Sequence, residues 1–392
     1  MASDLTYLLL IFALFVVPRA LQRFKLPSAI SSLVMGAALG LGFGLFLDDP
    51  TVHLLSTLGI VSLFLFAGLD VDVAALRRDW RVLLQHVGVR AVLIALVTLV
   101  GQWALHLELR PAIVLALALV TPSTGFILDS LPTFGLDDGE RTWVRSKAIA
   151  TEIVALLMLF LVLQSASAVR LAGGALALAA LILVLPVLFR LFTRLIAPFA
   201  PRSEFAFLLM TAMLAAFATK MLGAYYLVGA FVVGMVAQRL RGEAPALVSE
   251  KMLGLLEFFA SFFVPFYFFA AGLDLPASAL SLASALYGAA FLSCALPAQL
   301  LAVALHRRAA LGEPPRKSLR VALSLSPTLV FTLVLSGILA NQYGIAPEIR
   351  GGLMLYAVGT TLLPAIFLRA SPEFAVSTTH SQPPVKVSAP GS

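Results

Sequence analysis

The chain contains long apolar runs of roughly 18 to 25 residues, and short segments between them carry most of its charge. A helix needs about 20 residues to cross the hydrocarbon core of a membrane, whereas a strand needs only about 10. Lipid offers no hydrogen-bond partners, so spanning segments must be helices or closed barrels. Runs of this length therefore predict an all-α membrane protein.

The composition agrees with a lipid-facing surface. Hydrophobic residues make up 60% of the 392 residues and charged residues only 12%, whereas soluble domains carry about 25% charged residues. The net charge of +7 fits Lys and Arg in cytoplasmic loops better than nucleic-acid binding. With Cys294 as the single cysteine, an intrachain disulfide is impossible. We therefore expect the lipid bilayer, and no nucleic acid, as the surroundings of this chain.

Apolar windows predict about 13 transmembrane helices. The first run has neither a basic start nor a small-residue cleavage site, so we expect a retained helix rather than a signal peptide. The polar tail after residue 371 is expected to be disordered and too short to form a nucleotide-binding C-terminal domain. The predicted spans are 5–22, 27–46, 53–70, 82–105, 111–130, 143–168, 172–197, 204–221, 225–240, 252–272, 278–306, 318–341 and 349–369.

The distribution of basic residues predicts the orientation of these helices. Of the 27 Lys and Arg residues, 22 fall in every second loop, counting from the first, or in the tail. Only 4 fall in the opposite loops, and Arg90 lies inside a span. Because cytoplasmic loops are enriched in Lys and Arg, we expect the N-terminus outside and the C-terminus in the cytoplasm.

The sequence contains an internal repeat. FLFAGLDVD at residues 64–72 is nearly copied by FFAAGLDLP at residues 268–276, at an offset of 204. Thr121-Pro122-Ser123 corresponds to Ser326-Pro327-Thr328 at an offset of 205. A weaker pair is VMGAALG at residues 34–40 with VGAFVVG at residues 228–234. Two strong pairs at nearly one offset indicate duplication rather than chance.

The repeat predicts how the chain is divided. Each unit has six helices, and an odd linker helix between them makes corresponding helices run in opposite directions. Such an inverted 6+6 repeat is typical of secondary transporters, whose substrate sites lie between the halves near the membrane midplane. The expected divisions are the first repeat at 1–168, the linker helix at 169–200, the second repeat at 201–370 and the tail at 371–392.

A proline interrupts one predicted helix in each repeat. Pro122 and Pro327 remove a backbone donor and clash with the preceding turn, so each helix should break there. Interrupted helices at matching repeat positions point to a transport site. Ordinary proline kinks are the alternative. The flanking residues that could serve such a site are Thr121, Ser123, Thr124, Gly125, Ser326 and Thr328.

A carboxylate lies in the middle of the sixth predicted span. Glu152 there costs several kcal/mol in lipid unless it faces a cavity, forms an ion pair or takes up a proton. With Thr151, the hydroxyls near Pro122 and freed carbonyls, it could bind a monovalent cation in place of a proton. The alternative is a structural ion pair with Arg90 or Lys147. The chain has no phosphate-binding loop, nucleophilic triad or Cys/His cluster, so we expect neither an enzyme nor a cofactor.

The chain resembles the Kef-type branch of the monovalent cation:proton antiporter superfamily. The similar stretches include LFLFAGLDVDVAALRRD, ALALVTPSTGFILDSL, TEIVALLML, PFYFFAAGLDL and YAVGTTLLPAIFLR, and together such stretches cover residues 5–370. The resemblance implies a homodimer in which each subunit has a dimerisation domain and a core domain. It also implies that the two broken helices cross in the core domain beside the ion-binding carboxylate, whose position Glu152 occupies. Relatives carry Asn-Asp, Gln-Asp or Asp-Asp where this chain has Thr151-Glu152.

These observations favour exchange of Na⁺ or K⁺ for H⁺ across the cell inner membrane. A carrier of a small organic ion on the same scaffold is the second hypothesis, because SLSPTLVF departs from the sequence of Kef-type proteins at the second break. A non-transporting membrane sensor is the third, and the inverted repeat and Glu152 disfavour it. The sequence does not separate Na⁺ from K⁺, since both accept carboxylate and hydroxyl oxygens.

Overall fold

The computed structural model describes residues 4–24, 26–72, 78, 80–200, 203–222, 226–243 and 248–368, so the predicted tail lies outside them. All regular secondary structure in these residues is helical. The helices are α1 (Asp4–Gln22), α2 (Ser28–Phe43), α3 (Pro50–Leu69), α5 (Trp80–Leu105), α6 (Leu109–Val120), α7 (Thr124–Ser130), η1 (Leu131–Phe134), α8 (Asp138–Gln164), α9 (Ala168–Leu191), η2 (Phe192–Ile196), α10 (Glu204–Met221), α11 (Tyr226–Arg239), α12 (Glu250–Leu273), η4 (Ala277–Ala279), α13 (Leu282–Leu311), α14 (Pro315–Ser324), α15 (Leu329–Tyr343) and α16 (Pro347–Phe367).

The described residues contain ten helices or continuous helical segments that are long and apolar enough to cross a membrane. A further pair, α14 and α15, meets the same test together and is bent by 52° between its two parts. Helix α2 and residues 227–239 of α11 are apolar but shorter. The chain is therefore a multi-pass membrane protein, and the prediction of thirteen spans requires that α2 and α11 also cross.

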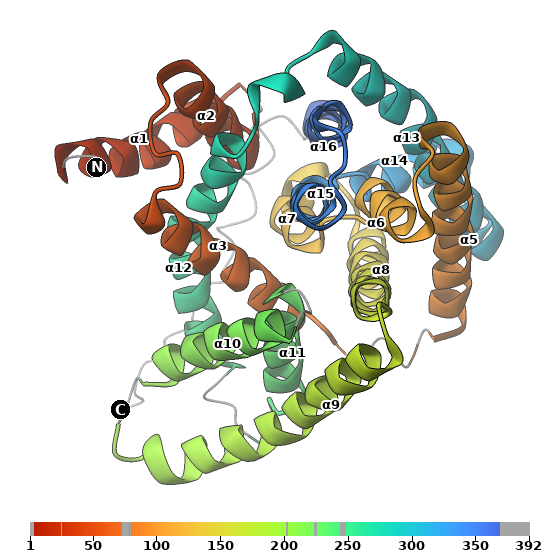
Figure 1. Ribbon diagram of the computed structural model, residues 1–392. Coiled ribbons are helices and arrows are strands. Elements are labelled where there is room, and N and C mark those ends of the chain that lie inside the picture. The colour runs from red at the N-terminus through yellow and green to blue at the C-terminus, as the bar shows by residue number, and fades with distance from the viewer. Residues whose placement is uncertain are drawn as a thin grey trace, which may run out of the picture.

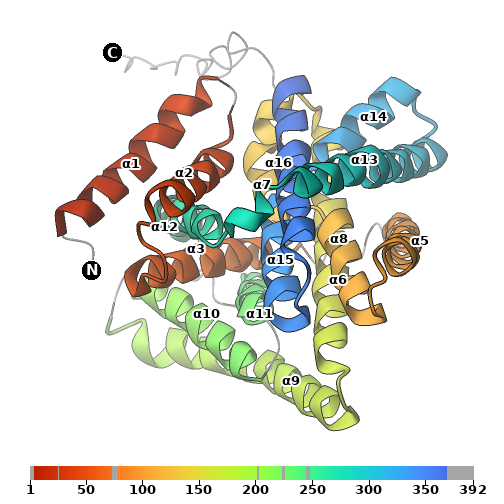
Figure 2. The same ribbon diagram turned by 45° about the horizontal axis from the view of Figure 1, so that its top comes forward.

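The helices form two bundles, which Figure 1 shows on opposite sides of the molecule. The scaffold bundle contains α1, α2, α3, α10, α11 and α12, and its centre is the packing of α3 against α12, with α2 on α12 and α11 on α3. The crossing bundle contains α5 to α8 and α13 to α16. Helix α9 runs along the edge from α8 to the scaffold bundle (Figures 1 and 2). Helix α3 packs against α7 across the boundary.

Glycines set the close packing inside the scaffold bundle. A Cβ on Gly68 of α3 would overlap the carbonyl oxygen of Phe231 in α11, and a Cβ on Gly234 of α11 would overlap that of Leu65 in α3. Gly36 of α2 and Gly272 of α12 are fitted together in the same way. Gly68 and Gly272 are the repeat-related glycines of the two GLD motifs, so the two helix pairs correspond.

This packing corrects the weaker sequence pair. Aligning VMGAALG with VGAFVVG matches Gly234 with Gly40, but the contact that corresponds to Gly234 against α3 is Gly36 against α12. The sequence alignment was therefore wrong by four residues, about one helical turn. Small residues recur on one face of a helix at this spacing, so neighbouring registers look alike in the sequence.

Both predicted helix breaks are present. Residues 121–123 separate α6 from α7, and residues 325–328 separate α14 from α15, so that Pro122 and Pro327 each lie in a non-helical segment. The interpretation as ordinary kinks is therefore wrong. Other prolines, such as Pro186 and Pro297, lie inside helices that continue past them. The two repeat-related prolines stand apart because their segments meet each other.

Candidate functional site

The two helix breaks cross in the crossing bundle, and Ser123 joins them. Its backbone N–H donates to the carbonyl oxygen of Pro327 over 2.8 Å. Its Oγ accepts hydrogen bonds from the N–H groups of Val330 (2.9 Å) and Phe331 (3.3 Å) in the first turn of α15. The first N–H groups of a helix have no partner within it. Ser123 therefore acts as an N-cap for α15 from the segment between α6 and α7. An ordinary N-cap serine directly precedes the helix that it caps.

Four side chains donate hydrogen bonds to the backbone carbonyl oxygens at the C-terminal end of α6. Their hydrogen bonds run from Thr332 Oγ1 to Ala118 O (2.7 Å), from Tyr356 OH to Leu119 O (2.7 Å), and from Arg90 Nη1 and Gln299 Nε2 to Val120 O (3.1 Å each). We expected the carbonyl freed by Pro122 to be open to a cation. That expectation was wrong for Ala118, whose carbonyl lies four residues before Pro122 and accepts from Thr332. The cation at this helix end is Arg90, which complements the negative end of the helix dipole.

The hydroxyls at the second break are also used within the protein. Ser326 Oγ donates to the carbonyl oxygens of Leu323 (2.8 Å) and Thr360 (3.1 Å). Thr328 Oγ1 lies 3.1 Å from the hydroxyl of Thr360 and 2.9 Å from that of Thr332, whose own proton goes to the carbonyl oxygen of Ala118. These contacts fix α15 against α16, so Ser326 and Thr328 hold the crossing together through their own hydrogen bonds.

Three buried oxygen atoms beside the first break have no hydrogen-bond partner. They are Thr121 Oγ1, Thr124 Oγ1 and Glu152 Oε2, and the exposed fraction of each side chain is 2% or less. The Glu152 carboxyl lies beside the hydroxyl and backbone N–H of Thr124. Buried polar atoms are nearly always hydrogen-bonded, so unsatisfied ones mark strain, function or a missing ion or water. Gly125, also predicted here, faces Leu63 of α3 across the bundle boundary.

Glu152 makes no ion pair with any residue that the structure describes. Arg90 bonds to Val120 instead, and Lys147 lies over the ring of Trp143, 5.5 Å from its centroid. The interpretation of Glu152 as a structural partner of Arg90 or Lys147 was therefore wrong. The carboxylate that acts on Glu152 electrostatically is Asp70, at the end of α3.

Thr151 points toward a buried histidine pair. Its hydroxyl donates to the carbonyl oxygen of Lys147 (2.8 Å) and lies 3.2 Å from His86 Nε2. The ring of His86 is 5.4 Å from that of His306, and both side chains are buried. His306 is the last residue of the predicted span 278–306, and its neighbours in the sequence indicate no partner. The available signal was that His86 lies four residues before Arg90, on one face of α5.

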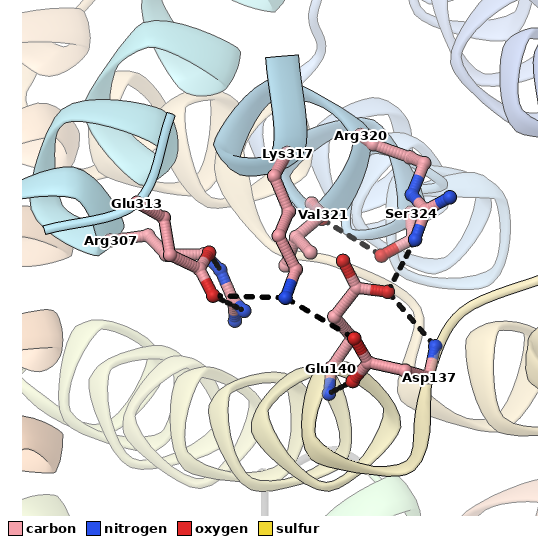
Figure 3. Close-up of polar contacts among 8 residues, drawn as sticks. All are labelled: Asp137, Glu140, Arg307, Glu313, Lys317, Arg320, Val321 and Ser324. Carbon is pink, nitrogen blue, oxygen red and sulfur yellow. Dashed lines mark hydrogen bonds and ion pairs between the residues drawn. The ribbon is translucent and has the colours of Figure 1, made fainter. Parts of the chain in front are cut away.

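A network of charged side chains closes the crossing bundle beside α14 (Figure 3). It joins the start of α8 to the end of α13 and the start of α14. Its ion pairs are Arg307–Glu313 (2.7 Å), Lys317–Glu313 (3.4 Å), Lys317–Asp137 (3.2 Å) and Arg320–Glu140 (2.6 Å), and Asp137 and Glu140 form a capping box at the start of α8. The network ties the start of α8, which follows the first break, to the end of α13 and the start of α14, which precede the second break.

The sequence pattern of a known family fits this arrangement. The family described as "Sodium/hydrogen exchanger, transmembrane" matches residues 9–370. The chain belongs to this family. Its members are transporters, so the chain is a transport protein rather than an enzyme. The match spans all helices of both bundles, including the crossing.

Individual relatives of this exchanger-family chain are distant. "Probable Na(+)/H(+) antiporter 3" of Methanocaldococcus jannaschii is 25% identical over 284 residues, which cover 68% of this chain and 70% of the relative. "Na(+)/H(+) antiporter NhaS5" of Synechocystis is 25% identical over 293 residues, which cover 70% of this chain and 40% of the relative.

A solved structure shares the fold. The sodium proton antiporter MjNhaP1 of Methanocaldococcus jannaschii superimposes with a TM-score of 0.69 at 14% sequence identity. The superposition covers 92% of this chain and 94% of that one. At this identity the likeness establishes the helical architecture of the exchanger-family chain and leaves the roles of its side chains to be argued from their own contacts.

Proposed function

We propose that the chain exchanges Na⁺ for H⁺ and that Glu152 binds the two ions in turn. The observation that carries the proposal is the group of three buried oxygens without partners, from Thr121, Thr124 and Glu152. Hard cations bind oxygen ligands, and a carboxylate with two hydroxyls is such a set. Ser123 and Thr151, which we also predicted as ligands, use their hydroxyls elsewhere, so we leave them out of the proposed shell.

The burial of Glu152 explains why the two ion movements are coupled. An unpaired carboxylate inside a membrane protein costs several kcal/mol, and this one forms no ion pair within the part of the chain that the structure describes. Binding either a proton or a monovalent cation neutralises it. The empty, charged site is the costly state, so it resists crossing the membrane while each loaded form crosses. A single carboxylate that never holds both ions then enforces exchange.

The two-bundle architecture supports alternating access. A cleft of about 930 Å³ lies between the bundles and is lined by parts of α2, α3, α10, α12, α15 and α16. It reaches Tyr267 of α12, whose hydroxyl is 3.5 Å from the carbonyl oxygen of Val330 in the crossing. Glu152 itself is 2% exposed. Movement of one bundle against the other, as in inverted-repeat transporters, would open the site to each side in turn.

The finer assignments belong to the same proposal. Na⁺ is favoured as the cation because the curated relatives are named as Na⁺/H⁺ antiporters, and K⁺ is tested beside it. The excess of Lys and Arg in alternate loops supports an external N-terminus. The family resemblance supports a homodimer in the cell inner membrane, with the scaffold bundle as the dimerisation domain.

The test is exchange in proteoliposomes with an imposed pH gradient. Na⁺, K⁺ or Li⁺ is added separately, and internal pH is followed with a fluorescent dye. Glu152→Gln should abolish cation-dependent proton movement, because the neutral amide has no proton to exchange for a cation. Glu152→Asp should stay active with an altered KM. Glu257→Gln, which changes an exposed carboxyl in α12, is the matched control and should exchange like the parent. Parental exchange by Glu152→Gln would contradict the site.

A further inference from the structure

The repeat relates two pairs of opposite charges that the crossing does not use. Asp70 and Asp274 end the two GLD motifs, 204 residues apart, and Arg145 and Arg350 lie 205 residues apart. Each Asp follows the last residue of a scaffold helix, α3 or α12. Each Arg lies in the first turns of a crossing-bundle helix, α8 or α16. The offsets are those of the copied motifs, so the pairs correspond.

In both pairs the Asp follows a scaffold helix and the Arg lies on a crossing-bundle helix, so each interaction crosses the boundary between the bundles. Asp70 interacts electrostatically with Arg145, and Asp274 with Arg350. In neither pair does a nitrogen atom of the arginine lie within 4.0 Å of a carboxylate oxygen of the aspartate. The arginine therefore weakens the field of its carboxylate without occupying it. Arg350 also has a buried Nε with no hydrogen-bond partner.

The two pairs lie at opposite ends of α3. Asp274 interacts with Asp48 and His53, next to and within the first turn of α3, whereas Asp70 follows the last residue of the same helix. A helix of 20 residues is about 30 Å long. The two carboxylates are therefore separated by about the thickness of the hydrocarbon core of a bilayer.

Each carboxylate is also connected with a part of the crossing. Asp274 and Arg350 both line the cleft between the bundles, which reaches Tyr267 beside the second break. On the other side, Asp70 is near enough to act electrostatically on Glu152. The cleft thus contains one carboxylate, Asp274, and the surroundings of Glu152 contain another, Asp70. In each case an arginine lies nearby without forming an ion pair.

We propose that Asp70 and Asp274 are repeat-related loading sites for the transported monovalent cation, one on each face, and that Arg145 and Arg350 keep each site weak. The inference rests on the proposed exchange function and adds two residues per face to it. A loading site must attract the ion yet release it onward. A lone carboxylate would hold the ion longer, and an arginine in contact would exclude it.

The sign of the effects tests this proposal. Exchange is measured in proteoliposomes with Na⁺ added on one face at a time. Asp70→Asn should raise the KM for Na⁺ about fivefold from the Asp70 face, since a half-screened charge is worth about 1 kcal/mol. Arg145→Gln should lower that KM by a similar factor. Asp274→Asn and Arg350→Gln should do the same from the other face, and each change should leave the opposite face within about twofold.

The faces are assigned independently of transport. Cys294 is the single cysteine and is exposed, so Cys294→Ser gives a background for Asp70→Cys and Asp274→Cys. A membrane-impermeant maleimide should label these two variants from opposite sides. Asp138→Asn and Glu108→Gln change exposed carboxyls beyond the two ends of the crossing and are the matched controls, with parental KM from both faces.

Each other outcome contradicts the proposal. A structural pair would make the Asp and Arg variants change in the same direction, with lower thermal stability and no dependence on the face. Parental KM in both Asn variants, with exchange intact in the parent chain, would overturn the loading sites alone. A parent chain that exchanges no monovalent cation would overturn the exchange function itself, and the loading sites with it.

Discussion

Ser123 and Thr124 are neighbouring hydroxyl residues with opposite predicted roles. Ser123 Oγ accepts from two buried N–H groups, those of Val330 and Phe331, whereas Thr124 Oγ1 has no partner. An unsatisfied buried donor costs about 1 to 3 kcal/mol, and loss of an N-cap costs about 1 kcal/mol. Ser123→Ala should therefore lower the free energy of unfolding by about 2 kcal/mol, and leave the cation shell intact.

Thr124→Val should change the stability little and weaken the binding of Na⁺. Valine keeps the volume of threonine, and the one polar contact that Thr124 Oγ1 loses is that with the Glu152 carboxyl at the proposed ion site, so the unfolding free energy should fall by no more than about 1 kcal/mol. The KM for Na⁺ should rise about tenfold, the equivalent of about 1.4 kcal/mol, because one oxygen leaves the shell.

Two measurements separate the variants. Thermal unfolding in detergent, followed by intrinsic fluorescence, reports stability, and proteoliposome exchange reports the KM. The expected pattern is a clearly lowered melting midpoint with parental KM for Ser123→Ala, and a midpoint closer to that of the parent with raised KM for Thr124→Val. The opposite pattern would refute the assignment of Ser123 to the cap and of Thr124 to the ion.

Two further predictions concern packing and pH. Gly68→Ala should lower the free energy of unfolding by about 1 to 3 kcal/mol or more, because the added Cβ overlaps the backbone of α11. Gly88→Ala is the control, since no atom lies within 4 Å of its added Cβ. In the same melting assay it should be neutral or stabilising. The Arg307 guanidinium holds the pKa of Glu313 below its ordinary value of 4.5. The pair therefore stabilises the fold above about pH 4.5 and loses this effect as the pH falls through the lowered pKa. The difference in melting midpoint between the parent and Glu313→Gln should shrink from pH 7 to pH 3, and a constant difference would contradict the pairing.

The features that sequence predicted correctly have local signals. Pro122 and Pro327 each remove a donor wherever they lie in a helix, so the breaks follow from single residues. The GLD copies and the two proline motifs share nearly one offset, which made the correspondence between the halves visible. Glu152 was found because a carboxylate in an apolar run must have a partner, a cavity or a ligand.

The features that sequence could not predict depend on contacts between distant segments. Nothing near Ser123 distinguishes its hydroxyl from that of Thr124, because the difference lies in α15, more than 200 residues away. The carbonyl of Ala118 appeared free for the same reason, since its donor is Thr332. His306 acquires a partner only when α13 packs beside α5.

The large sequence separation between the α6 carbonyls and their hydrogen-bond donors also constrains how the protein folds during synthesis. Thr332 and Tyr356 lie 214 and 237 residues after the carbonyls they satisfy. At about 5 to 20 residues per second, α6 leaves the ribosome about 10 to 40 s before its partners exist. A bare carbonyl in lipid costs several kcal/mol. Until α15 and α16 are made, the α6 carbonyls must therefore be hydrogen-bonded by water or by the insertion machinery. A nascent chain released before α15 cannot complete the crossing.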